Sequence, residues 1–136
     1  MNRDAQITGN IGLYYVCYHL SRLGWNVMPT ARNARGIDIV AYTPDAASFI
    51  GIQVKALSKH PAVPLGGTLD KVSGDFWIIV NQVATEEPMA HIMLPDEVRH
   101  HATSNEKEGR VSYWLSRKYY ELEKYRNAWE RIVAVN

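Results

Sequence analysis

Three residues whose side chains could act together in catalysis are Asp38, Gln53 and Lys55, which fall on two consecutive predicted β-strands. Successive side chains of a strand point to opposite faces, so Gln53 and Lys55 share one face of the second strand. If the strands form a hairpin in which Tyr42 lies opposite Phe49, counting back along both strands places Asp38 opposite Gln53. The sequence therefore predicts an acid, an amide and an amine on one patch of sheet.

This patch has the chemistry of a divalent-cation site. The carboxylate of Asp38, the amide oxygen of Gln53 and the backbone carbonyl of Val54 are hard oxygen donors, which suit Mg²⁺ or Mn²⁺. A cation held there could polarise a phosphodiester and help to generate hydroxide from water. The Lys55 amine could orient that water and offset the charge that develops on the phosphate oxygens. The arrangement is suited to hydrolysis of a nucleic-acid backbone.

The elements that must hold these residues are predicted from periodicity and boundary residues. Thr8 is placed to cap a helix over 9–23 that Gly24 ends, and the apolar residues of this helix recur at the spacing of one buried stripe. A continuous apolar run at 76–80 is typical of a strand buried on both faces. The other predicted elements are strands over 25–28, 37–42, 49–57, 90–94 and 111–115, a loop over 58–67, a short helix that begins at Pro95, a charged turn over 106–110 and a helix over 117–132. The order predicts an α/β fold with a small mixed sheet flanked by helices.

Asp38 followed by Gln53-x-Lys55 on the next strand resembles the active site of the PD-(D/E)xK nuclease superfamily. The preceding elements are similar too, because a helix that starts with Gly9 and Gly12, then Leu-Gly-Trp and a strand, come before the Asp38 strand. The resemblance covers residues 1–80, and the Gln-x-Lys variant is similar to a branch with intron-encoded homing endonucleases and uncharacterised bacterial and phage proteins. It implies a restriction-endonuclease-like fold, with a mixed central β-sheet flanked by α-helices.

The resemblance also implies an activity. It implies a metal-dependent endonuclease that hydrolyses DNA phosphodiester bonds with Mg²⁺ or Mn²⁺. Because small nucleases of this kind often pair two active sites to cut both strands, a homodimer is expected as well. The implied roles are metal ligation by Asp38, Gln53 and the Val54 carbonyl, catalysis by Asp38, Gln53 and Lys55, and contacts to DNA backbone phosphates by Arg32, Asn33 and Arg35, which lead into the Asp38 strand.

Two departures from the family pattern keep a second function open. Family members commonly carry a glutamate directly after the second glycine of the first helix, where this chain has Leu13. Gln53 also replaces an acid, so the predicted site keeps one formal negative charge unless Asp70 or Asp75 supplies another. The alternative is a catalytically weakened or inactive domain of this fold that serves as a nucleic-acid-binding or regulatory module. A third reading is a structural or interaction domain in which the motif is accidental.

Length and composition restrict the class of protein. The 136 residues predict a single domain, and the net charge of +1 gives no overall signature of a nucleic-acid binder. The single cysteine, Cys17, excludes an intrachain disulfide. The absence of a long apolar run and of a signal-peptide core predicts a cytoplasmic protein with no membrane association. The histidines, including His100 and His101, match no metal-binding motif, and no Gly-x-Ser-x-Gly sequence is present.

Overall fold

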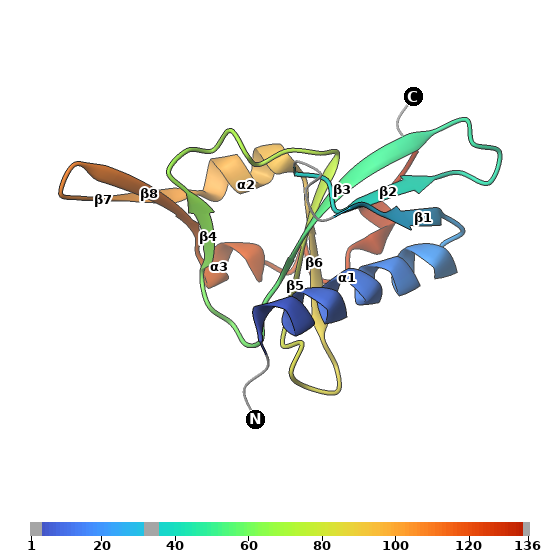
Figure 1. Cartoon of the computed structure of the whole chain (residues 1–136), viewed down its shortest axis with the longest axis horizontal. Coiled ribbons are helices and arrows are strands. Elements are labelled where there is room, and N and C mark those ends of the chain that lie inside the picture. Colours follow the sequence, from blue (N-terminus) through green and yellow to red (C-terminus); the bar gives the residue numbers. More distant parts are fainter. Residues whose placement is uncertain (1–3, 32–35, 135–136) are drawn as a thin grey trace.

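The computed structural model describes residues 4–31 and 36–134, and Figure 1 shows their arrangement. The helices in these residues are α1 (Ala5–Arg22), α2 (Pro95–His101), α3 (Arg117–Tyr120) and a short 3₁₀-helix, η1 (Trp129–Arg131). The strands are β1 (Asn26–Pro29), β2 (Ile39–Tyr42), β3 (Phe49–Ala56), β4 (Val63–Gly66), β5 (Phe76–Asn81), β6 (Met89–Met93), β7 (Thr103–Lys107) and β8 (Arg110–Leu115). The chain is a mixed α/β protein, as the sequence predicts.

The described strands form two sheets. The larger, five-stranded sheet has the order β1-β2-β3-β5-β6, in which β3 and β5 are parallel and all other neighbours are antiparallel. The smaller sheet has the antiparallel order β4-β8-β7. Tyr42 lies opposite Phe49 in the β2–β3 pair, so the predicted register is confirmed.

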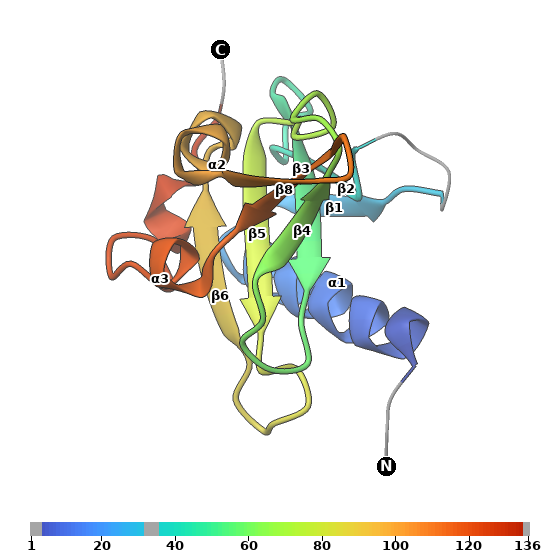
Figure 2. The same ribbon diagram turned by 90° about the vertical axis from the view of Figure 1, so that its left-hand side faces the viewer.

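The five-stranded sheet is covered differently on its two faces. Figures 1 and 2 show α1 on one side of it, and the smaller sheet with α2 and α3 on the other. The core on the α1 side includes Val16, Cys17 and Leu20 of the helix together with Ile39, Ala41, Ile50, Ile52, Phe76, Ile78, Val80, Ala90 and Ile92 of the sheet. The core on the other side includes Val63, Leu65, Trp77, Ile79, Met93, Leu115, Tyr120 and Tyr125.

The first helix begins one turn earlier than predicted. Its N-cap is Asp4, whose Oδ1 accepts a hydrogen bond from the backbone N–H of Ile7 at 2.9 Å, while Thr8 is buried inside the helix. Gly24, with a φ of +97°, follows the helix end, as predicted. Neither α1 nor any other helix in the described part of the chain has the length and apolarity needed to cross a membrane.

The predicted C-terminal helix over 117–132 is wrong. The helix α3 stops at Tyr120, and the chain then runs along the free edge of β6. There the Tyr125 carbonyl accepts a hydrogen bond from the Ile92 N–H at 2.9 Å, and the Asn127 N–H donates to the Ala90 carbonyl at 2.8 Å. A continued helix would leave these edge groups of β6 without a backbone partner, so pairing with β6 overrides the helical spacing of the apolar residues.

Two strands lie outside the predicted set. The strand β4 lies within the predicted loop over 58–67, where Pro64 argues against a central strand. The strand instead pairs with β8 at the edge of the smaller sheet, where Pro64 is exposed and proline is tolerated. The strand β7 is exposed along its whole length and has no apolar alternation to mark it. It joins β8 through Glu108 and Gly109, both with positive φ, which is the hairpin turn that the predicted charged turn contains.

Candidate functional site

Asp38 lies one residue before β2, where the pairing of β2 with β3 ends. Its backbone N–H donates to the Ile52 carbonyl at 2.8 Å, which extends the pairing by one residue. Its side chain turns toward β3, where Oδ2 accepts a hydrogen bond from the Val54 N–H at 2.7 Å. The carboxylate thus takes the position of a backbone carbonyl from a longer β2 and satisfies an N–H of β3 that would otherwise lack a strand partner.

A polar cavity of about 370 Å³ opens beside this carboxylate, and we call it the Asp38 cavity. On α1, Gln6 and Asn10 are four residues apart and so lie on one face of the helix. The complete lining is Gln6, Gly9, Asn10, Leu13, Thr30, Ala31, Asp38, Val54 and Ala56. Its polar side chains are one carboxylate, two amides and one hydroxyl, which all carry oxygen donors that suit a hard cation.

The shape of the Asp38 cavity depends on two glycines of α1. A Cβ on Gly12 would lie 2.5 Å from the Cβ of Ala56, so only glycine lets the helix approach β3 this closely. A Cβ on Gly9 would meet no atom within 4 Å, because this residue faces the open cavity. The Gly-x-x-Gly pattern therefore marks the contact of α1 with β3 directly beside Asp38.

Gln53 and Lys55 line a different cavity of about 880 Å³, which we call the Lys55 cavity. Its lining residues are Gly36, Gln53, Lys55, Pro64, Leu65, Gly66, Asp70, Lys71, Val72, Ser73 and Trp77. Gln53 is only 8% exposed, and its Oε1 accepts hydrogen bonds from Trp77 Nε1 at 2.5 Å and from the Ser73 N–H at 3.4 Å. The Lys55 Nζ lies 6.0 Å from the centre of the Trp77 ring.

The structure therefore separates the residues that the sequence places on one patch. Asp38 and Val54 line the Asp38 cavity, whereas Gln53 and Lys55 line the Lys55 cavity. The register is as predicted, but strand alternation does not set the direction of a side chain at a strand end, and the bond to Val54 turns Asp38 to the strand edge. The predicted phosphate contacts Arg32, Asn33 and Arg35 lie outside the described residues.

The acids considered as replacements for the missing glutamate lie elsewhere. Asp70 lines the Lys55 cavity. The Asp75 carboxylate accepts a hydrogen bond from the Gly51 N–H at 2.8 Å and lines neither cavity. Leu13, which stands where the family commonly has a glutamate, lines the Asp38 cavity. Across residues 4–31 and 36–134, no three or more His, Cys, Asp or Glu side chains gather as a metal-binding group.

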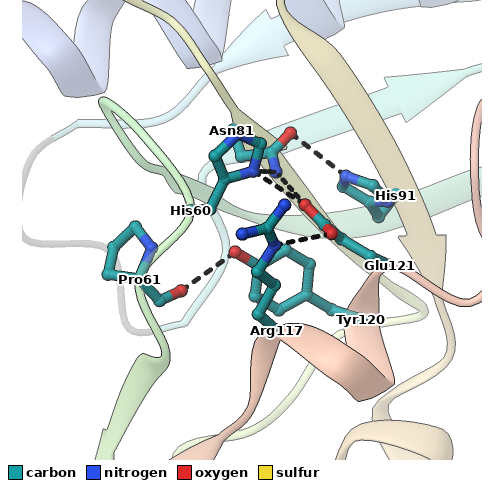
Figure 3. A network of polar contacts seen from close by, with 7 residues as sticks. All are labelled: His60, Pro61, Asn81, His91, Arg117, Tyr120 and Glu121. Atoms are coloured by element: carbon teal, nitrogen blue, oxygen red, sulfur yellow. Dashed lines mark hydrogen bonds and ion pairs between the residues drawn. The ribbon is translucent and has the colours of Figure 1, made fainter.

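A second group of polar residues, which sequence analysis missed, surrounds Glu121 (Figure 3). Its carboxylate accepts hydrogen bonds from His60 Nδ1 at 2.8 Å, Asn81 Nδ2 at 2.9 Å and Arg117 Nε at 2.8 Å. Burial raises the pKa of Glu121, but the hydrogen bonds from Arg117, His60 and Asn81 outweigh it, so the pKa is lowered overall. Arg117 and Glu121 are four residues apart, but His60 and Asn81 come from distant segments, so no sequence spacing signals the whole cluster.

Comparisons of the chain with protein-family models, with curated proteins and with solved structures give no match. The resemblance to the PD-(D/E)xK superfamily thus stays a prediction from the sequence.

Proposed function

We propose that this chain is a metal-dependent endonuclease of the restriction-endonuclease-like type, which hydrolyses DNA phosphodiester bonds at the Asp38 cavity. The observation that carries the proposal is the Asp38 carboxylate, held at 2.7 Å against the backbone of Val54 in a polar cavity beside α1. Aspartate is depleted in strands, and here it fills a strand-edge position beside a cavity rather than a solvated surface. That placement supports a functional reading of the residue.

The donor set of the Asp38 cavity fits Mg²⁺ or Mn²⁺. Asp38 would hold the cation through its carboxylate, and Val54 would assist through its carbonyl, which in an extended strand points to the same edge as its N–H. Gln6 and Asn10 add amide oxygens on the helix side. Gln53 does not fit this donor set, because it lines the Lys55 cavity and its amide oxygen is bonded to Trp77. When bound, the cation would polarise the phosphodiester and favour a metal-bound water as nucleophile.

The cationic side chains of the proposed enzyme lie on the other face of β3. Lys55 directly follows Val54 and shares its cavity with Lys71. Two ammonium groups there would offset the charge of phosphates bound across the end of β2. Arg32, Asn33 and Arg35 stay predicted phosphate contacts, since they precede Asp38 directly in the sequence.

One observation favours a second candidate function, a nucleic-acid-binding or regulatory module without catalysis. Asp38 is the one carboxylate among the residues that line its cavity within the described part of the chain, and the other polar groups there are neutral. A single charge gives weak attraction for a divalent cation, so binding of DNA could persist where cleavage does not.

The test is an Asp38→Asn variant, measured by Mn²⁺ calorimetry and by nicking of supercoiled plasmid. Asparagine keeps an oxygen that can accept the Val54 N–H bond and removes only the charge. We expect cation binding to be lost and the nicking rate to fall by about 100-fold or more. Asp75→Asn is the matched control, since Asp75 also accepts an N–H of β3 at 2.8 Å but lies outside the cavity; it should nick like the wild type.

The outcomes separate the two candidate functions. Cation binding and nicking that need Asp38 but not Asp75 support the endonuclease. Binding of DNA by wild type and Asp38→Asn alike, with no nicking by either, supports the binding module. Equal nicking by the wild type and Asp38→Asn removes Asp38 from any catalytic role.

A further inference from the structure

His60 is held in one orientation by Glu121. Its Nδ1 lies 2.8 Å from Glu121 Oε1 and 3.2 Å from Asn81 Nδ2. A carboxylate only accepts hydrogen bonds, so Nδ1 carries a proton and donates it to Glu121. This leaves Nε2 as the free nitrogen of the ring, and no hydrogen bond joins it to any residue in the ranges 4–31 and 36–134.

The orientation of Glu121 is itself fixed from several sides. Arg117 holds Oε2 from the same helical turn, and Asn81 holds Oε1 from the buried end of β5. Asn81 is in turn oriented by His91, whose Nε2 donates to Asn81 Oδ1 at 3.1 Å (Figure 3). Asn81 and His91 are almost completely buried, so this chain of bonds makes a rigid support for the carboxylate. A carboxylate that binds Nδ1 fixes the tautomer of a histidine and presents its Nε2 to a ligand.

The polar side chains that line the cavity beside His60 can all donate hydrogen bonds or carry positive charge. The cavity measures about 710 Å³ and is lined by Ala5, Thr8, Ala56, Leu57, Ser58, Lys59, His60 and Pro61; we call it the His60 cavity. The hydroxyls of Thr8 and Ser58 lie 3.4 Å apart. Lys59 adds an ammonium group, and no carboxylate is among the lining residues within the described ranges. The His60 ring keeps 32% of its side-chain surface exposed.

We propose that the His60 cavity is a binding site for a phosphate group, which His60 Nε2, Lys59 and the hydroxyls of Thr8 and Ser58 contact. A phosphate offers several acceptor oxygens and negative charge, which match two hydroxyl donors, one ammonium and an imidazole that donates from Nε2 when it binds a proton. Glu121 acts as a positioning residue, because its hydrogen bond to Nδ1 holds the ring in one orientation.

The phosphate can come from a small phosphorylated molecule or from a nucleic-acid backbone. The His60 cavity adjoins the Asp38 cavity, since Ala56 lines both and neighbouring residues of α1 line each. A nucleic acid that lies along the N-terminal half of α1 would therefore bring successive phosphates to both cavities. The phosphate site itself does not depend on cleavage at Asp38, so it goes beyond the proposed nuclease activity.

The test follows the imidazole resonances of the full chain by ¹⁵N-edited NMR during titration with inorganic phosphate at neutral pH and constant ionic strength. We expect selective shifts of the His60 ring. His60→Asn should weaken phosphate binding by about tenfold or more, because Asn keeps a donor near the Nδ1 position for Glu121 but has nothing at the position of Nε2. The matched control is His100→Gln, an exposed histidine of α2, which should bind phosphate like the wild type.

The positioning role and the source of the phosphate have separate readouts. Glu121→Gln should change the tautomer populations of His60, seen in its ¹⁵N shifts, a result that a purely structural side chain would not give. Titration with thymidine monophosphate and with a short oligonucleotide that lacks terminal phosphates identifies the source, since the tighter ligand is the one the site is built for. Binding by either ligand that is weakened in His60→Asn supports the site.

Two results overturn the proposal: phosphate shifts that spread equally over all histidines, or wild-type phosphate affinity in a folded His60→Asn variant. The Asp38→Asn variant separates this inference from the proposed function. Retained phosphate binding in that variant with nicking lost supports both. Selective His60 shifts in a protein that never nicks DNA leave the phosphate site and remove the nuclease. Nicking without any shift of His60 does the reverse.

Discussion

The two faces of the five-stranded sheet differ in the kind of side chain that they bury. The face toward α1 contributes only apolar side chains to the core, and the amphipathic helix covers them. The opposite face carries every buried polar side chain that the sheet contributes within the described residues, namely Gln53, Asn81 and His91. Each of them has a hydrogen-bond partner: Gln53 accepts from Trp77 of β5, Asn81 donates to Glu121 at the end of α3, and His91 donates to Asn81. Burial of a polar group without such a partner would cost stability, so this face needs specific contacts and the other does not.

This contrast between the two faces decides where a functional site can form. The α1 face is closed in its middle, so the Asp38 cavity lies at its margin, where β2 ends and α1 approaches β3 at Gly12. On the opposite face, hydrogen bonds link His91, Asn81 and Glu121 to His60, and His60 lines the His60 cavity. Apolar packing stabilises both faces, and the buried hydrogen bonds that orient side chains lie on the face away from α1.

The largest effect is expected from loss of packing on the α1 face. Ile78 of β5 is fully buried there, and Ile78→Ala should lower the free energy of unfolding by about 2–5 kcal/mol, because it removes buried methyl groups and leaves a cavity. Ile7→Ala is the matched control, since Ile7 on α1 is 46% exposed; it should change stability by no more than about 0.5 kcal/mol. Urea unfolding of both variants checks this, and equal losses would contradict the assignment of the core.

The next largest effect is expected from protonation of His91, on the face of the sheet away from α1. Burial lowers the pKa of His91 to about 4, with Arg126 and His60 acting in the same direction and Glu121 against it. The unfolded chain has an ordinary histidine pKa near 6.5, so it takes up the proton first as the pH falls. The stability that neutral His91 provides is therefore present above about pH 6.5 and is lost progressively toward about pH 4.

Denaturant unfolding at two pH values measures this loss. Between about pH 7 and about pH 5, the wild type should lose about 2 kcal/mol that His91→Gln does not lose. Gln keeps a donor near the position of Nε2 for Asn81 and has no proton to take up. His100→Gln, on the surface, should keep the wild-type dependence. Identical pH dependence in the wild type and His91→Gln would show that His91 is not the group that titrates.

The apolar face could be predicted from the sequence because its signals are local. The apolar run at 76–80 identifies β5, and the alternation of Ile52 and Val54 with Gln53 and Lys55 identifies β3. The C-terminal segment shows the limit of such signals. Leu122, Tyr125 and Ile132 have helical spacing, yet Tyr125 bonds to the edge of β6 instead, and no local pattern encodes an edge that needs a partner.

The candidate sites were predictable in part, for the same reason. The register that sets Asp38 beside the β3 residues follows from strand patterning, but the direction of its side chain depends on one hydrogen bond to Val54 at a strand end. The pair of His60 and Glu121 joins residues 61 positions apart. Neither a histidine at position 60 nor a glutamate at position 121 belongs to a recognisable sequence pattern, so the pair is seen only in the folded structure.

The smallest effect concerns Gln53. The sequence predicts it as a metal ligand, whereas in the structure its amide oxygen is a buried acceptor for Trp77. A double-mutant cycle of Gln53→Met and Trp77→Phe measures the contact. The coupling energy in urea unfolding should be about 0.5–1.5 kcal/mol, because each single change leaves one buried polar atom without its partner and the double change removes both. If Gln53 has this structural role, Gln53→Met binds Mn²⁺ as the wild type does. Loss of Mn²⁺ binding with no coupling to Trp77 would instead return Gln53 to the cation site, and the bond to Trp77 would then have to break when the cation binds.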